Sequence, residues 1–204
     1  MEETRRERKK RQTKQLLVST AYRLFSEQGY ERTTVAQITS EADVATKTFF
    51  NYFPSKEDVL FSDAEHYYET ALEVLAERAP DEGVPELLLR TYDRVIARYL
   101  ADGPLAGDRE RMEVYGNLIM SVPAVQAKAL HVLFDLQSKI AGAFVKAFPD
   151  ELDPISAAAA LGALLGAVQA ATRTCGELHG HSEEEYLKAG RRAVEIAMRG
   201  LGAL

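Results

Sequence analysis

Apolar residues recur at every third and fourth position along most of the chain. This spacing places them on one face of a helix, and no segment shows the convincing alternation of apolar and polar residues that predicts a strand. Proline, glycine and acidic residues interrupt the pattern. The predicted helices cover approximately residues 13–28, 34–42, 45–51, 56–79, 85–101, 108–120, 123–148, 154–177 and 182–201. The sequence therefore predicts an all-α protein.

Two short helices follow one another early in the chain with almost no linker. Thr34 is expected to cap the first of them, with Gln37 reaching back in a capping box. The second runs from Ala45 to about Asn51 and ends before Pro54, because a proline biases the preceding residue away from the helical conformation. Two short helices joined by a tight turn predict a helix-turn-helix, whose second helix enters the DNA major groove.

The side chains of the second short helix divide into two sets. At about 100° per residue, Ala45 and Phe49 share one side and are expected to pack inward. The outward set is small, polar and basic apart from one aromatic ring, and comprises Thr46, Lys47, Phe50 and Asn51. The alternative is an ordinary surface helix, because short two-helix turns occur in many folds that never contact DNA.

The combination of residues around this motif is distinctive. It includes Leu24-Phe25, Gly29-Tyr30, Thr33-Thr34-Val35, Ile38, Ala42, Val44, Thr48, Phe49-Phe50-Asn51-Tyr52-Phe53 and Pro54-Ser55-Lys56-Glu57. Over roughly residues 12–60, this run closely resembles the DNA-binding domain of the tetracycline-repressor-like (TetR) family. Ala45 stands where that family usually has serine or threonine, and Asp43 where it often has glycine. The first difference removes a helix cap worth about 1 kcal/mol, so both differences concern local stability rather than DNA contact.

The resemblance implies which residues lie at the DNA. They are Thr34, Thr46, Lys47, Thr48, Asn51, Tyr52 and Lys56. We expect Lys47 and Asn51 to read base edges, because lysine suits the acceptors of guanine and asparagine suits adenine. Tyr52 is expected to offer its hydroxyl to the DNA backbone. Lys56 is expected at the N-terminus of a long helix, where backbone N–H groups and the helix dipole favour an anion such as a phosphate.

The resemblance also implies a second, regulatory domain. Residues 1–55 are predicted to form a basic arm and the helix-turn-helix domain, and residues 56–204 a helical domain that binds a small-molecule effector and a second copy of the chain. The predicted effector pocket contains aromatic and polar side chains, namely Tyr67, Tyr92, Arg111, Tyr115, His131, Phe134, Phe144 and Arg173. Each has an ordinary alternative as a core or surface residue at helical spacing.

Residues 155–172 carry no charge, and this stretch of 18 is long enough for a membrane span. Alanine and glycine dominate it, so we predict a surface for another helix and no membrane. Gly162 and Gly166 stand four residues apart with Ala158 one turn earlier, which leaves one edge nearly bare backbone. In the resembling family, the last two long helices pair with their copies. The predicted homodimer interface therefore includes Ala158, Gly162, Leu165 and Gly166.

Charge is divided unevenly along the chain. Residues 1–60 hold 11 Lys or Arg against 9 Asp or Glu, whereas residues 61–204 hold 14 against 22. A net charge of −6 therefore still allows a basic DNA-binding face. Seven basic residues among the first fourteen predict either a solvated, partly disordered tail or an arm that follows DNA phosphates. Thr4 with Glu7 also forms a capping pattern, which gives the first helix an alternative start before residue 13.

The sequence argues against an enzyme. Cys175, Glu177, His179 and His181 cluster near a helix end, but no further cysteine or histidine motif completes a metal site. The chain has no Gly-rich phosphate loop, nucleophile elbow or HExxH motif. A single cysteine excludes an intramolecular disulfide and, with a charged N-terminus that lacks a secretory signal, predicts a cytoplasmic protein. We predict no metal and no cofactor.

These features together predict a homodimeric transcriptional regulator. We expect a repressor that binds a palindromic DNA operator with one helix-turn-helix in each half-site. We also expect a small-molecule effector that binds the DNA-incompetent arrangement more tightly than the competent one. The alternatives are a helical module that binds a protein partner or a small molecule without a sequence-specific DNA role, and a metal-dependent enzyme.

Overall fold

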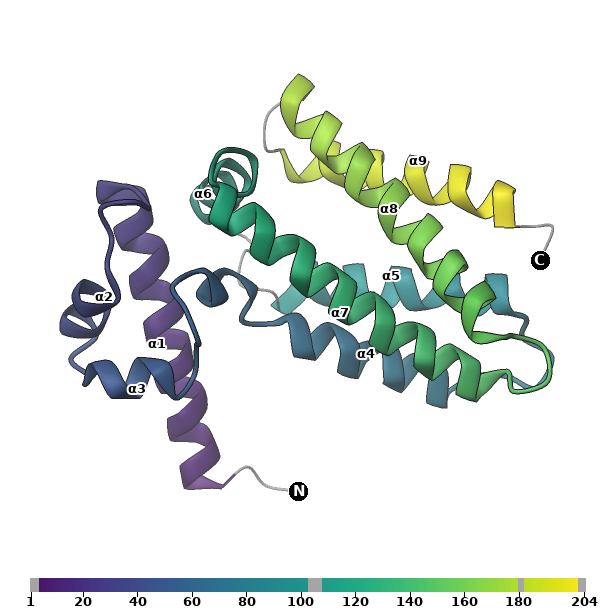
Figure 1. Ribbon diagram of the computed structural model, residues 1–204, viewed down its shortest axis with the longest axis horizontal. Helices are drawn as coiled ribbons and strands as arrows, with labels where there is room; N and C mark the ends of the chain where they lie inside the picture. Colours follow the sequence, from purple (N-terminus) through teal and green to yellow (C-terminus); the bar gives the residue numbers. More distant parts are fainter. Residues whose placement is uncertain (1–3, 103–107, 180–181, 202–204) are drawn as a thin grey trace. The chain divides into compact units, whose positions relative to one another are not determined.

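The computed structural model describes residues 4–102, 108–179 and 182–201, and all regular secondary structure within these ranges is helical (Figure 1). The elements are α1 (Arg5–Gln28), α2 (Val35–Glu41), α3 (Thr46–Phe50), the 3₁₀ helix η1 (Glu57–Phe61), α4 (Ala64–Ala76), α5 (Val84–Asp102), α6 (Arg109–Ser121), α7 (Pro123–Ala147), α8 (Pro154–His179) and α9 (Glu183–Leu201). The predicted all-α class is confirmed.

Contacts divide the chain into two compact units. Unit 1 comprises Met1–Ser62 and Asp108–Ala129, and unit 2 comprises Asp63–Gly107 and Leu130–Leu204. Unit 1 therefore holds α1, α2, α3, η1, α6 and the start of α7, and unit 2 holds the remaining helices. The predicted boundary between residues 55 and 56 concerns a division of function, and it stays a prediction.

Unit 1 is built on the inner face of α1. Leu17, Ala21 and Phe25 lie buried on this face at intervals of one turn. Ile38 of α2 and Phe49 of α3 are both 0% exposed. Isolated helices as short as α2 and α3 are unstable in water, so burial of these side chains, rather than helix propensity, holds them in place.

The first helix begins earlier than residue 13. Thr4 is its N-cap, and its hydroxyl oxygen accepts a hydrogen bond from the Glu7 backbone N–H at 3.2 Å. The Glu7 carboxylate accepts one from the Thr4 backbone N–H at 2.8 Å, which completes a capping box. The alternative start is therefore confirmed, and residues 5–14 form the first turns of α1 rather than a disordered tail. Gly29, with φ +84°, ends the helix as predicted.

The single helix predicted over residues 56–79 is wrong. η1 ends at Phe61, and α4 begins only at Ala64. The ammonium of Lys14 donates a hydrogen bond to the Ser62 carbonyl oxygen at 2.5 Å, so this carbonyl is held by α1 at the point where the chain breaks. The tight 3₁₀ turn also buries Val59 and Leu60 in unit 1. A contact between residues 48 positions apart therefore divides the helix.

Unit 2 has a core to which four helices contribute. Phe144 and Phe148 of α7 stack with their ring centroids 6.4 Å apart. Val74 of α4, Leu87 of α5 and Leu161 of α8 belong to the same cluster of buried side chains. α8 also lies against α9, and α4 lies against α5 (Figure 1).

The helix α8 is long and apolar enough to cross a membrane, judged by length and composition alone. The segment that passes this test is Pro154–Leu178, and 22% of its most apolar window is buried within the chain. The bent pair formed by α6 and α7 passes the same test when its two helices are taken together. Much of the small-residue surface of α8 is therefore exposed, and the interpretation of this surface as a helix contact stays a prediction.

Candidate nucleic-acid interface

The capping box at the start of α2 forms as predicted. The Thr34 hydroxyl oxygen accepts a hydrogen bond from the Gln37 backbone N–H at 3.2 Å, and the Gln37 side-chain carbonyl accepts one from the Thr34 backbone N–H at 2.8 Å. Thr34 is itself exposed. Its backbone and side chain therefore fix where α2 begins, and the residue stays at the surface of unit 1.

A tight turn connects α2 to α3. Asp43 has φ +51°, in the left-handed region that glycine adopts most easily and that aspartate tolerates better than most residues. The Val44 backbone N–H then donates to the Thr39 carbonyl at 3.0 Å, which closes the turn. This conformation explains why the resembling family often has glycine at this position.

The helix α3 is only five residues long and depends on one buried ring. Phe49 is 0% exposed and packs against Phe53 with ring centroids 5.4 Å apart. Ala45 is the N-cap and provides no side-chain hydrogen bond, as predicted. The hydroxyl groups of Thr39 and Thr46 instead lie 3.3 Å apart across the turn. Packing and this contact therefore orient the helix.

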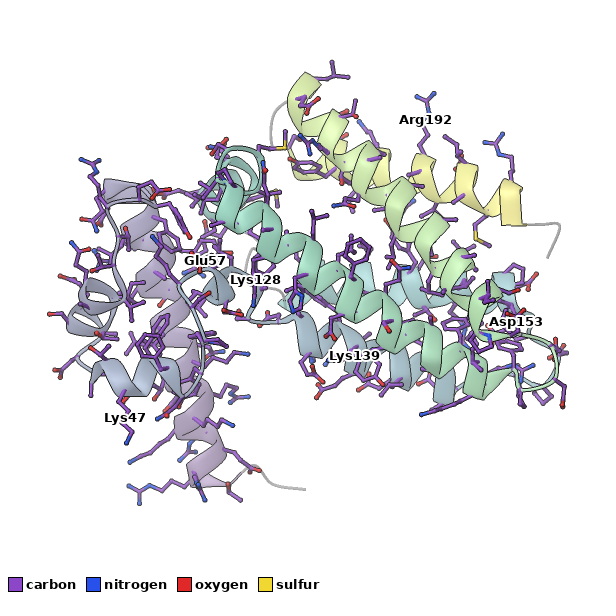
Figure 2. The ribbon with its side chains drawn as sticks, in the orientation of Figure 1. Lys47, Glu57, Lys128, Lys139, Asp153 and Arg192 are labelled. Atoms are coloured by element: carbon purple, nitrogen blue, oxygen red, sulfur yellow. The ribbon has the colours of Figure 1, made fainter. Side chains whose placement is uncertain are left out.

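The opposite face of α3 is open to solvent. Thr46, Lys47 and Asn51 are exposed, whereas Thr48 and Tyr52 are partly buried. Figure 2 shows Lys47 extending away from α3. The structure thus brings five of the seven predicted DNA-binding residues together on and directly after one short helix, in a surface that a DNA groove is wide enough to receive.

Phe50 lies on the same face and was not among the predicted DNA-binding residues. Its side chain is 53% exposed, and its ring meets the Phe49 ring edge to face with centroids 5.6 Å apart. A large aromatic ring exposed beside polar side chains is the signal that was available in the sequence, because the helical spacing already placed this residue outward.

The ammonium of Lys56 is directed into the protein. It donates hydrogen bonds to the backbone carbonyls of Tyr30 at 2.8 Å and Thr33 at 3.0 Å, and lies 3.7 Å from the centroid of the Tyr30 ring. Burial lowers the pKa of Lys56 below its ordinary value. These contacts tie the segment after α3 to the loop between α1 and α2, and a phosphate contact by Lys56 stays a prediction.

A carboxylate next to this lysine joins the same loop. The Tyr30 hydroxyl donates a hydrogen bond to the Glu57 carboxylate at the start of η1 (Figure 2). Burial raises the pKa of Glu57, but hydrogen bonds from Ser55 and Tyr30 outweigh that effect and leave the pKa below its ordinary value. Burial and Glu57 both raise the pKa of Tyr30. The charged form of Glu57 is therefore favoured in the folded protein.

Two of the predicted effector-pocket residues belong to unit 1. Arg111 of α6 pairs with the Asp108 carboxylate at 3.0 Å and lies 5.9 Å from the centroid of the Tyr22 ring of α1. Tyr115, also on α6, meets the Phe61 ring with centroids 6.1 Å apart, and burial raises its pKa to about 12. Both side chains therefore have contacts with α1 or η1.

The other six predicted pocket residues belong to unit 2, in different environments. Phe144 is 0% exposed in the core, whereas Phe134 is 63% exposed. Tyr67 lies beside Tyr99 with ring centroids 5.9 Å apart, and burial raises the pKa of Tyr92. The remaining two, His131 and Arg173, are exposed. The structure thus does not gather the eight residues into one unit, and the pocket stays a prediction.

The predicted dimer-interface residues differ in their exposure. Ala158 and Gly166 are exposed on α8, whereas Gly162 and Leu165 are partly buried. The Gln137 side-chain amide of α7 donates to the Ala158 carbonyl at 3.3 Å, and a Cβ added at Gly162 would lie 3.1 Å from the same amide. A Cβ added at Gly166 would meet no atom within 4 Å. The edge around Gly166 is therefore open.

The candidate metal ligands lie only partly within the described structure. Cys175 is buried and Glu177 is exposed, whereas His181 and the side chain of His179 lie outside what the structure describes. Among the described residues, no three His, Cys, Asp or Glu side chains are placed to hold a metal ion.

Known proteins resemble this chain in its first third and in its fold. The family model for bacterial regulatory proteins of the tetR family matches residues 17–62. The HTH-type transcriptional regulator TcmR of Streptomyces glaucescens is 32% identical over 137 residues, which cover 67% of this chain and 60% of TcmR. The HTH-type transcriptional regulator HbdR of Aromatoleum sp. (strain CIB) is 44% identical over 54 residues, which cover 26% of this chain and 24% of HbdR. The chain thus spans less than two thirds of the length of either relative.

Solved structures show the same fold along the whole chain. A crystal structure described as a tetR-family transcriptional regulator from Mesorhizobium loti MAFF303099 aligns with a TM-score of 0.58 at 17% identity, and the alignment covers 98% of each chain. At this identity the likeness concerns the fold alone. It extends to the helices that follow residue 62, beyond the segment that the family model matches.

Proposed function

Because the chain belongs to the tetR family of bacterial regulatory proteins, we propose that it is a DNA-binding transcriptional regulator. The observation that carries this proposal is the construction of α3. Phe49 anchors the helix in unit 1, and Lys47 and Asn51 stand exposed on its outer face. This arrangement offers one donor for guanine and one amide for adenine to the major groove. The function needs no catalytic group.

We propose that the regulator acts in the cytoplasm as a homodimer that represses transcription. Two copies related by a two-fold axis place one α3 in each half of a palindromic operator, and a bound dimer blocks the promoter. A small-molecule effector ends repression only when it binds the DNA-incompetent arrangement more tightly, because equal affinity for both arrangements shifts no population. The family membership and the exposed small-residue edge of α8 support these parts of the proposal.

Selection of bound duplexes from a random DNA library tests this function. The purified dimer is incubated with the library at near-physiological salt, because binding to phosphates alone dominates at low salt. We expect enrichment of an inverted repeat whose half-sites are about one helical turn apart, or a multiple of it. A folded dimer that is free of bound small molecules and enriches no sequence would overturn the proposal and favour a partner-binding module.

The open edge of α8 allows a test of the dimer. Replacing Gly166 by phenylalanine is expected to leave the protomer folded, because a Cβ there meets no atom within 4 Å. The ring would instead occupy the space that the partner helix needs, and overpacking of this kind typically costs about 1–3 kcal/mol. We therefore expect the dimer dissociation constant, measured by analytical ultracentrifugation, to rise about tenfold or more.

A matched control exists on α7. Gly142 is also an exposed helical glycine at which a Cβ meets no atom within 4 Å, but it lies outside the proposed interface. Gly142→Phe is expected to dimerise like the wild type. Equal dissociation constants for Gly166→Phe and the wild type would exclude this edge from the interface, whatever the oligomeric state.

Phe50 gives the base-reading surface an apolar contact. We propose that its exposed ring touches a thymine methyl group, the apolar feature of the major groove. Replacing that thymine by deoxyuridine removes one methyl group, and a contact of about 0.8 kcal/mol corresponds to about fourfold weaker binding. A scan of deoxyuridine substitutions through the operator should show this loss at one symmetric pair of positions. Phe50→Ala should lose sensitivity at that pair alone, and an unchanged scan would refute the contact.

A further inference from the structure

The first turns of α1 form a basic arm, which we define as residues 5–14. It carries seven cationic side chains and one acidic side chain, Glu7, which belongs to the capping box with Thr4. The cationic residues are Arg5, Arg6, Arg8, Lys9, Lys10, Arg11 and Lys14. The capping box satisfies backbone N–H groups at the first turn, so the arm begins with a firm helix end rather than a frayed one.

The arm is exposed along most of its length and fixed at its inner end. Residues 5–12 are exposed, and the first buried residue of α1 is Leu17. Lys14 is partly buried and donates its hydrogen bond to the Ser62 carbonyl at 2.5 Å. At 1.5 Å per residue, the arm extends about 15 Å. An exposed, like-charged helix of this length has no core of its own to stabilise, so its charges are available to a partner.

The arm also lies outside the segment that defines the family. The match to the tetR family model begins at residue 17, after the arm has ended. In Figure 2 the first turns of α1 and the side chain of Lys47 extend toward the same end of unit 1. Whatever DNA lies against the outer face of α3 therefore has these cations on the side toward which it continues.

We infer that the basic arm is a rigid phosphate-binding element that grips the DNA backbone next to the half-site held by α3. This inference rests on the proposed function and adds a second contact region to it. A continuous helix holds its cations at fixed positions relative to α3, so little conformational entropy is lost when they meet phosphates. Phosphate contacts fix register and raise affinity without reading sequence. The arm therefore enlarges the footprint beyond the bases that α3 reads.

Salt dependence of binding measures these contacts directly. Each phosphate contact that a protein gives up reduces the slope of log K against log salt by about 0.9. The variant Arg5→Gln/Arg6→Gln keeps good helix formers in the arm and removes two charges per protomer. On a duplex that carries the selected inverted repeat with long flanks, we expect its slope to fall by about 2 or more per dimer. The same fall is expected on random DNA.

A matched control removes the same pair of residues elsewhere. Arg191 and Arg192 are also adjacent, exposed arginines on a helix, and Figure 2 shows Arg192 on α9. Arg191→Gln/Arg192→Gln changes the net charge equally, so it corrects for the general effect of charge on association. We expect this control to keep the wild-type slope. Equal slopes for both double variants and the wild type, with operator binding intact, would overturn the inference and leave the proposed function standing.

A third variant separates a rigid arm from a flexible one. Gln12→Pro keeps every charge but breaks the helix between the arm and the buried part of α1, because proline lacks the N–H and clashes with the preceding turn. The core of unit 1 begins at Leu17, so unit 1 should stay folded. We expect Gln12→Pro to lose as much slope as Arg5→Gln/Arg6→Gln. A wild-type slope for Gln12→Pro would overturn the rigid element and leave a flexible tail. Absence of any selected operator would instead mean that the proposed function has failed.

Discussion

Replacing Lys47 by alanine is expected to weaken binding to the operator by about 5- to 150-fold, the range that a specific base contact of about 1–3 kcal/mol gives. The side chain is exposed on α3 and extends away from unit 1 (Figure 2). Its removal should therefore leave the free energy of unfolding within about 0.5 kcal/mol of the wild-type value. Fluorescence anisotropy with the operator and with random DNA of the same length measures the two affinities.

The ratio of these two affinities decides what Lys47 does. A base contact is lost on the operator far more than on random DNA, because random sequences seldom offer the preferred base at the right place. Asn51→Ala provides a second measurement on the same face of α3 and should change the preference at a different base pair. Equal losses for Lys47→Ala on both DNAs would mean that this lysine contacts phosphate and only positions the helix.

Lys56→Met is expected to lower the free energy of unfolding by about 2–4 kcal/mol, since hydrogen bonds made by a charged group contribute about 1.5–3 kcal/mol each. The ammonium donates to the carbonyls of Tyr30 and Thr33, and it also lies over the Tyr30 ring. Methionine keeps most of the aliphatic stem, so the loss reports the ammonium group. Urea unfolding followed by circular dichroism measures the change.

A lysine outside the fold's internal contacts provides the control. Lys47→Met makes the same chemical change on the exposed face of α3 and should unfold at the wild-type urea concentration. When folded at low urea, Lys56→Met should keep most of its operator affinity. Wild-type stability combined with equally weaker binding to every DNA would contradict this structural role and establish Lys56 as the phosphate contact that its sequence position indicates.

The helix-turn-helix could be predicted because its signals are local. Thr34 with Gln37, the outward and inward sides of α3, and Gly29 after α1 each act within a few residues of where they stand. Capping boxes and glycine stops need no distant partner to form. The sequence also contained the early start of α1, through Thr4 and Glu7, although the run of charge pointed equally to a tail.

The missed features depend on contacts between distant residues. The helix predicted from residue 56 to residue 79 is divided where Lys14 holds the Ser62 carbonyl, and no local pattern reveals that bond. Lys56 is likewise turned toward carbonyls of the loop between α1 and α2. Helical periodicity shows which face of a helix is apolar, but it does not show which helix covers that face. Arg111 and Tyr115 illustrate this, because α6 packs in unit 1 rather than with the other predicted pocket residues.

The ion pair between Lys128 and Asp58 is a further example. Its charged atoms lie 2.5 Å apart, and both side chains are largely buried (Figure 2). It joins the start of α7 to η1 within unit 1. The two residues are 70 positions apart in the sequence, so neither charge announces its partner. Such pairs explain why unit 1 includes a segment that follows residue 107, which the sequence assigned entirely to the regulatory domain.

Parallel selections from one random duplex library, by the wild type and by Lys47→Ala/Asn51→Ala, test most directly whether α3 reads an operator. Both proteins are first shown to be folded dimers of equal stability. The account predicts that the wild type enriches an inverted repeat and that the variant loses preference at the same base pairs in both half-sites. Enrichment of an identical motif by both proteins, or of no motif by a folded wild-type dimer, would contradict it.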